Sequence, residues 1–448
     1  MNVLESRSGR PLRLRPWVLL TGAVVIVAAV LYFTNTSSSN GNSGSHDASS
    51  SAHVKKSGGS GGSGSGASTG FFLKSSTPST GAQGVPANST ISLTFSSPVK
   101  LRTSATPTLT PNIAGKWVQS NPTTLSYQLD SPMIPESQEV VTIPGGTSGL
   151  HSTGGAALSS SHSVSFNVAD GSTLRLQELL AGLNYLPLGF APSGPQPVRA
   201  DLAEDQQGTF SWRWANMPSE LTSQWTQGTE NEITKAAIMA FETQNNLGVD
   251  GVAGPAVWTA LINDTINDKA DATPYVYVLV NKALPENLTL WNNGATPYVG
   301  IPVNTGAPGA DTTDGTFAVF EHVRFSDMKG TNPDGSTYDD PNVPYASYFN
   351  GGDALHGFVR ASYGSPQSNG CVEMSYADAA LVWPLTPVGT LVTVVGPNYG
   401  TAPPPTTTTT TAPPATTTTA PPPAPTTAPA PAPTTTPTAA PAATPPPG

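Results

Sequence analysis

Two low-complexity tracts limit how much of this chain can fold. Residues 34–70 are mostly Ser, Gly and Asn, and residues 398–448 turn almost entirely to Pro, Thr and Ala. Neither tract has the apolar residues that a packed core requires, so we expect a flexible linker and an extended, disordered tail. The folded part of the chain is therefore expected between residues 71 and 397.

Charge and cysteine content exclude several functions. The chain has 19 basic and 29 acidic residues, and no basic cluster follows its N-terminal segment, so nucleic acid is not an expected partner. Cys371 is the single cysteine, which rules out an internal disulfide and a zinc site built from thiolates. We expect no cofactor. Cys371 has three possible roles: a small side chain that fills the core, a residue with no particular role, or a reactive thiol.

The N-terminus has the pattern of an export signal. Residues 1–16 contain four arginines opposed by Glu5, and an uncharged apolar run follows at 17–33. The run is short for a bilayer span, but no small-x-small cleavage site follows it, which favours an uncleaved anchor over a cleaved signal peptide. Positive charge before the run predicts a cytoplasmic N-terminus and a single-pass protein of the cell membrane, with its domains in the extracytoplasmic space.

Short alternating apolar runs recur between residues 71 and 170, at 91–95, 125–129, 141–143 and 164–168. Alternation with period two predicts half-buried strands, and several in succession predict a β-sandwich. No acid–base pair is apparent there, so we assign the region no chemistry. It resembles bacterial Ig-like domains through Gly84-Val85-Pro86, Thr94-Phe95 and Gly115-Lys116-Trp117.

Helical spacing follows in residues 171–268. Apolar residues recur on one face of 174–183 and 230–244, Thr229 and Glu232 fit a capping box, and Pro255 suits the first turn of a third helix. This segment resembles the three-helix peptidoglycan-binding module through Gly182-Leu183-Asn184-Tyr185-Leu186-Pro187, Ala240-Phe241, Asp250-Gly251-Val252-Ala253-Gly254-Pro255 and Trp258. Trp212 and Trp214 suit either core packing, which we favour, or an aromatic platform for sugar.

The β pattern returns in residues 272–397, which we predict to be a mostly-β domain. Candidate strands lie at 275–280, 288–291, 298–301, 317–320 and 391–395. Asn292-Asn293-Gly294 is a strong hairpin signal between two of them. Ser375 followed by Asp378 predicts the start of a short helix after Cys371.

This domain contains a histidine and the single cysteine about fifteen residues apart, in His356-Gly357 and Ser368-Asn369-Gly370-Cys371-Val372. Turn residues at 363–366 allow the segment to fold back so that the two side chains meet. A free thiol is mostly protonated near neutral pH, and an adjacent imidazole that takes its proton makes it a nucleophile toward acyl carbons. The alternative is that both residues are ordinary core or surface positions.

The domain resembles the L,D-transpeptidase catalytic domain of the YkuD type. That family's pattern is His-Gly, a gap of about fifteen residues, and Ser/Thr-His-Gly-Cys followed by an apolar residue. Three positions depart from the pattern: Asn369 stands for His, Glu373 for a frequent Arg, and Asp314 for a common Pro. A neutral amide at position 369 cannot share acid–base work.

The resemblance implies a set of site residues. Cys371 is the nucleophile and His356 the general acid and base, oriented by the backbone near Gly357, while the backbone at Gly370 supports the oxyanion. Candidate substrate-binding residues are Ser368, Asn369, Arg360 and Tyr345, although Arg360 is equally well a solvated surface residue. The resemblance also implies acylation of Cys371 by carbapenems.

The expected fold class is therefore a membrane anchor, an Ig-like β-sandwich, a small three-helix domain, a mostly-β YkuD-like domain and a disordered tail. The expected function is formation of 3-3 cross-links in peptidoglycan, with a donor tetrapeptide stem and an acceptor stem as partners. The alternatives are an L,D-carboxypeptidase that passes the acyl group to water and a non-catalytic wall-binding scaffold.

Overall fold

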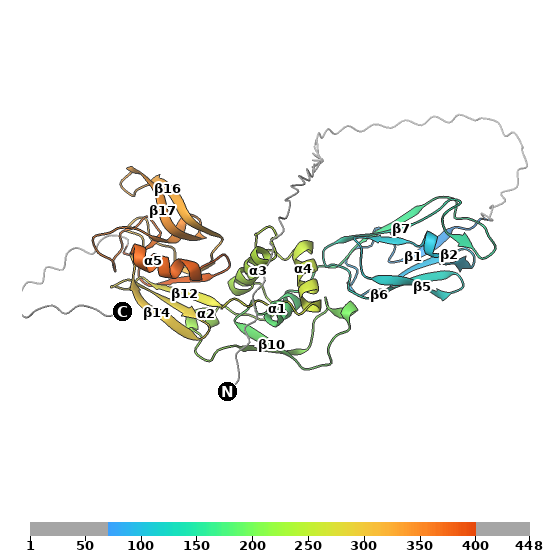
Figure 1. Ribbon diagram of the computed structural model, residues 1–448, viewed down its shortest axis with the longest axis horizontal. Helices are drawn as coiled ribbons and strands as arrows, with labels where there is room; N and C mark the ends of the chain where they lie inside the picture. The colour runs from blue at the N-terminus through green and yellow to red at the C-terminus, as the bar shows by residue number, and fades with distance from the viewer. Residues whose placement is uncertain (1–69, 400–448) are drawn as a thin grey trace, which may run out of the picture. The chain divides into compact units, whose positions relative to one another are not determined.

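The computed structural model describes residues 70–399. The predicted anchor at 17–33, the linker at 34–70 except its last residue, and all but the first two residues of the tail at 398–448 lie outside the described residues. Across residues 70–399, no helix is both long and apolar enough to cross a bilayer. The described domains follow one another along the chain (Figure 1).

The N-terminal domain is the predicted β-sandwich. One sheet has the strand order β1-β2-β6-β5, a second has the order β4-β7-β9, and β3 pairs with β8. Leu93, Leu125 and Val141 are fully buried in the single core cluster that both sheets share. Its strands are β1 (Leu73–Thr77), β2 (Ile91–Phe95), β3 (Val99–Lys100), β4 (Thr108–Thr110), β5 (Gly115–Asn121), β6 (Thr124–Leu129), β7 (Gln138–Ile143), β8 (His151–Ser152) and β9 (His162–Asn167).

The helical segment has the three predicted helices and two additions. Its elements are α1 (Thr173–Gly182), the hairpin strands β10 (Leu188–Pro192) and β11 (Gly208–Trp212), α2 (Ser219–Thr222), α3 (Glu232–Gln244) and α4 (Pro255–Ile266). Pro255 begins α4 as predicted, and the helix runs to Ile266. Trp212 and Trp214 pack against the helical core, and Trp214 meets Trp291 edge to face at 5.1 Å, so the packing role is confirmed.

The predicted capping box of α3 is wrong. Asn231 is the N-cap, and its side-chain oxygen accepts the Thr234 backbone N–H at 2.9 Å. The Asn231 amide nitrogen also donates to the carbonyl oxygens of Thr226 and Thr229. Asparagine is among the best N-cap residues, and these two further contacts fix it at the cap in place of Thr229.

Two sheets form the C-terminal domain. One has the order β14-β13-β12-β20-β15 and the other the order β16-β17-β18-β19. Apolar side chains of both share one core, with Val278 and Val392 from the first and Leu355 and Val372 from the second. The elements are β12 (Val276–Asn281), β13 (Asn287–Asn292), β14 (Ala295–Pro302), β15 (Gly315–Ala318), β16 (Glu321–Thr331), β17 (Thr337–Asn350), β18 (Asp353–Gly357), β19 (Val372–Met374), α5 (Tyr376–Val382) and β20 (Leu391–Val395).

Local signals in this domain agree with the structure. Asn293 and Gly294 have φ of 45° and 85° and form the tight turn between β13 and β14. Ser375 caps α5 by accepting the Asp378 backbone N–H. The long hairpin of β16 and β17, orange in Figure 1, was not predicted, because much of it is polar on both faces and lacks an apolar alternation.

The N-cap of α3 gives a testable prediction. Replacing Asn231 by Ala leaves the Thr234 N–H without its side-chain acceptor, so we expect a loss of about 1 to 2 kcal/mol in the free energy of unfolding. Thr229→Ala is the matched control and should change it by no more than about 0.5 kcal/mol. Urea unfolding of residues 70–399 measures both, and equal losses would contradict the assignment of the cap.

Candidate active site

The pairing of β18 with β19 brings His356 and Cys371 together. The two strands are parallel, with Leu355 opposite Val372 and His356 opposite Glu373. Cys371 precedes β19 by one residue and so comes opposite Ala354. Because side chains alternate along a strand, Cys371 and His356 lie on the same face, two residues apart along the sheet.

The His356 ring is buried and oriented by the backbone. Its Nδ1 lies 3.2 Å from the Gly357 carbonyl oxygen, so a proton on Nδ1 is donated there and Nε2 is the nitrogen that can accept a proton. Burial lowers the pKa of His356 below its ordinary value. The imidazole is therefore neutral near neutral pH, which is the form a general base requires.

Cys371 is partly accessible and is held as a thiol. Its Sγ lies 3.6 Å from the Gly352 carbonyl oxygen. Burial against surrounding protein atoms and, to a smaller extent, the carboxylates of Asp353 and Glu373 raise the pKa of Cys371 to about 12. The resting pair is consequently a neutral thiol beside a neutral imidazole, an arrangement in which an attacking sulfur would have to lose its proton.

The residues before Cys371 form a tightly bonded loop. Ser368 is buried, and its Oγ donates to the Cys371 carbonyl oxygen at 2.6 Å and accepts the Gly370 backbone N–H at 3.2 Å. Gly370 has φ of 110°, and a Cβ at this position would collide with the Asp353 carboxylate. The Gly370 N–H is therefore engaged inside the loop, whereas Ser368 supports the backbone on either side of the nucleophile.

Arg360 is bound by the protein itself. Its Nε donates to Oε2 of the buried Glu373 at 2.7 Å, and one terminal nitrogen donates to Oε1 at 2.7 Å. A bidentate pair of this kind is both strong and geometrically specific. Glu373 thus faces Arg360, and the positive charge of Arg360 is already neutralised.

Asn369 and Tyr345 contact residues other than His356 and Cys371. The exposed Asn369 side chain donates to Asn332 Oδ1 at 2.6 Å, which links the loop before Cys371 to the turn between β16 and β17. Tyr345, on β17, packs against Trp383, and the Arg324 guanidinium lies 5.3 Å from its ring centre. Neither side chain contacts His356 or Cys371 through an observed hydrogen bond.

Asp353 and Thr312 are site residues that the sequence patterns did not single out. Burial raises the pKa of Asp353 to about 6, and Asn350 donates to its carboxylate at 3.3 Å. Thr312 Oγ1 donates to the Gly370 carbonyl oxygen at 2.7 Å. Asp353 precedes His356 by three residues and Thr312 lies far upstream, so no local motif marks either of them.

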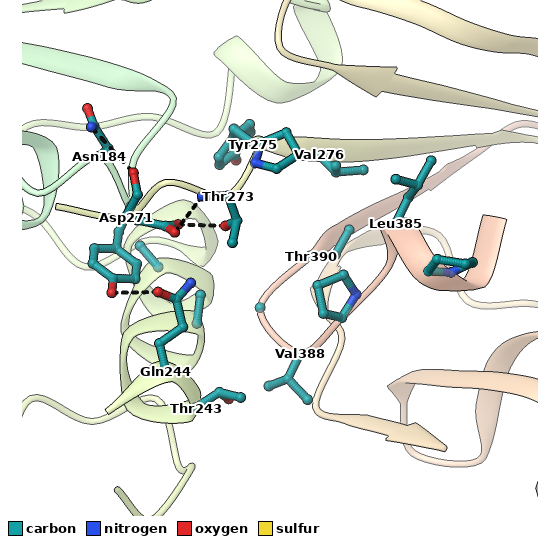
Figure 2. A pocket seen from close by; sticks show the side chains of 17 residues that line it. Asn184, Thr243, Gln244, Asp271, Thr273, Tyr275, Val276, Leu385, Val388 and Thr390 are labelled. Carbon is teal, nitrogen blue, oxygen red and sulfur yellow. Dashed lines mark hydrogen bonds between the residues drawn. The ribbon is translucent and has the colours of Figure 1, made fainter. Parts of the chain in front are cut away.

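Among the described residues, neither a metal site nor the apolar cavity in Figure 2 is part of this candidate site. Within residues 70–399, no three His, Cys, Asp or Glu side chains are grouped to hold a metal ion. A cavity of about 350 Å³ is lined by Gln244 and Asp271 on one side and by Leu385 and Val388 on the other (Figure 2). His356 and Cys371 do not line it.

Three segments of the chain match known domain families. Residues 275–394 match the L,D-transpeptidase catalytic domain (YkuD), residues 67–168 a bacterial Ig-like domain, and residues 223–261 a peptidoglycan binding domain. The three resemblances expected from the sequence are thereby confirmed. His356 and Cys371 both fall inside the L,D-transpeptidase catalytic domain. No curated protein matches the chain.

Solved L,D-transpeptidases are among the structural neighbours. One from Mycobacterium smegmatis is 14% identical, with 73% of this chain and 100% of that chain covered and a TM-score of 0.25. L,D-transpeptidase 3 from Mycobacterium tuberculosis is 13% identical, with 72% and 98% covered and a TM-score of 0.25. The catalytic domain from E. faecium is 23% identical, with 28% and 100% covered and a TM-score of 0.25.

The ion pair of Arg360 and Glu373 gives a testable prediction. Arg360→Met leaves the Glu373 carboxylate buried and unpaired, so we expect a loss of about 3 kcal/mol in the free energy of unfolding. The double variant Arg360→Met with Glu373→Met removes the orphan charge and should recover most of that loss. Urea unfolding measures both; an Arg360→Met protein as stable as the wild type would show that the pair contributes nothing to the fold.

Proposed function

We propose that this chain is an L,D-transpeptidase that forms 3-3 cross-links in peptidoglycan through a thioester on Cys371. The observation that carries the proposal is the placement of His356 and Cys371 on one face of paired strands, inside the matched catalytic domain. The matched peptidoglycan binding domain supports a peptidoglycan substrate.

The first half-reaction is acylation. The Cys371 sulfur attacks the carbonyl carbon of the L,D bond that links the diamino acid of the donor stem to its terminal D-Ala. His356 Nε2 takes the thiol proton and then gives it to the departing amine, so the C–N bond breaks, D-Ala leaves and a thioester remains. The thiol carries the proton that this step transfers, and Nε2 of the neutral imidazole is free to accept it.

The second half-reaction is transfer. The side-chain amine of the acceptor stem's diamino acid attacks the thioester carbon, and His356 takes a proton from that amine. The C–S bond then breaks, and His356 gives the proton to the sulfur of Cys371, which leaves as a thiol. The Cys371 backbone N–H is the candidate donor to the oxyanion in both steps, because the Gly370 N–H is already bonded to Ser368.

The proposed location is the cell envelope. The arginines before residue 17 and the apolar run at 17–33 support export and anchoring of the following domains outside the membrane. Anchoring beside a polymer would raise the effective concentration of stem peptides at the catalytic domain.

Product analysis tests the proposed function. Residues 70–399 incubated with tetrapeptide muropeptides should release D-Ala and give cross-linked dimers detectable by mass spectrometry. Cys371→Ala should give no product, and a carbapenem should add its mass to the wild type but not to this variant. Tripeptides without dimers would favour the L,D-carboxypeptidase alternative, and absence of any adduct on wild-type Cys371 would favour a non-catalytic scaffold.

The protonation states give a second test. His356 must be neutral to accept the thiol proton, and burial lowers its pKa, so the acylation rate should stay level down to a pH of about 6.5 and fall only below it. Stopped-flow acylation by a carbapenem across pH 4.5 to about 8 measures this profile. Asp353 titrates near the same range, so Asp353→Asn is the control; a fall centred above about 6.5 in both proteins would contradict the role of His356.

A further inference from the structure

Lys282 is a buried cation that the mechanism above does not use. It follows β12 directly, and its side chain is 2% exposed. Its Nζ lies 2.8 Å from Asp314 Oδ1, donates to the Thr312 carbonyl oxygen at 3.1 Å, and also contacts Asn398. A buried ammonium is costly unless it is paired and hydrogen-bonded, so these contacts are what keep Lys282 in place.

Asp314 belongs to a tripeptide that reaches the catalytic loop. Thr312 Oγ1 donates to the Gly370 carbonyl oxygen at 2.7 Å and accepts the Gly306 backbone N–H at 2.8 Å. The backbone N–H of Thr313 stabilises the carboxylate of Asp353, the group that packs against Gly370. Residues 312–314 therefore connect the buried ammonium to the backbone immediately before the nucleophile.

The contact from Thr312 fixes the direction of a specific N–H group. The Gly370–Cys371 peptide is trans and planar, so its carbonyl and its N–H point in opposite directions. Holding the Gly370 carbonyl toward Thr312 therefore aims the Cys371 N–H away from Thr312. Gly370 with φ of 110° is free to rotate in ways that other residues are not, so this peptide needs an external restraint.

We propose that the Lys282–Asp314 ion pair is a positioning device that, through Thr312, sets the Cys371 N–H as the oxyanion donor. The proposal rests on the proposed acyl-transfer function. Asp314 stands where the family pattern commonly has proline. A proline ring restricts the backbone by itself, whereas an aspartate restricts it only if its side chain is held by another residue. In this chain the ion pair supplies that restraint from the protein interior.

The test separates oxyanion stabilisation from general reactivity of the thiol. Acylation by a carbapenem passes through an oxyanion, whereas alkylation by iodoacetamide displaces iodide and does not. In the double variant Lys282→Met with Asp314→Asn, which leaves no orphan ammonium, the acylation rate constant should fall about 10- to 100-fold. Alkylation should stay within about twofold of the wild type, because no oxyanion donor is used.

Two further variants complete the design. Thr312→Val keeps the shape of the side chain, removes the hydroxyl and should reproduce the selective loss of acylation. The exposed pair of Lys329 and Asp339, 3.0 Å apart on β16 and β17, is the matched control, and Lys329→Met with Asp339→Asn should leave both rates unchanged. Intact mass at timed intervals measures both adducts in every protein.

Each outcome has a distinct meaning. Acylation of the double variant and of Thr312→Val at the wild-type rate would overturn the positioning role while leaving the proposed function intact. Parallel loss of acylation and alkylation would show that the pair supports the fold in general and would also overturn it. A wild-type protein that is alkylated but not acylated by the carbapenem or by tetrapeptide would overturn the proposed function itself.

Discussion

The parallel pairing of β18 with β19 is the interaction on which the candidate site depends. It places Cys371 and His356 on one face of a sheet through backbone hydrogen bonds between the two strands. Leu355 and Val372, opposite each other in this pairing, are buried in the core of the domain. A one-residue slip would turn these two side chains toward the face that carries His356 and Cys371, so the register that places them in the core also sets the geometry of the candidate site.

Burial around this pairing explains the electrostatics of the site. The same packing that excludes water from His356 and Cys371 favours the neutral form of each, which lowers the pKa of the first and raises that of the second. A neutral resting pair differs from a preformed thiolate. In the proposed mechanism, charge would develop only once the acyl carbon is in place, where a positioned N–H could stabilise the oxyanion.

Two buried charges of this domain, on Glu373 and Lys282, have ion-pair partners. Arg360 neutralises Glu373 at 2.7 Å, and Asp314 neutralises Lys282 at 2.8 Å. Residues that differ from the family pattern, Glu373 and Asp314, are both members of these pairs. The charge that each of these residues introduces is therefore neutralised within the domain. Asn369, the third residue that differs, is uncharged and donates a hydrogen bond to Asn332 in the β16–β17 turn.

The sequence alone determined the features that depend on neighbours along the chain. Alternating apolar residues marked strands such as β2, Asn293-Gly294 marked a hairpin, Ser375 marked the start of α5, and the spacing of His356 and Cys371 marked the candidate site. Only the tertiary structure decided that Arg360 faces Glu373, that Asn231 caps α3, and that Thr312 bonds to Gly370. Several partners compete for each of these side chains, and packing determines which of them comes within hydrogen-bond distance. Residue type alone does not rank such partners.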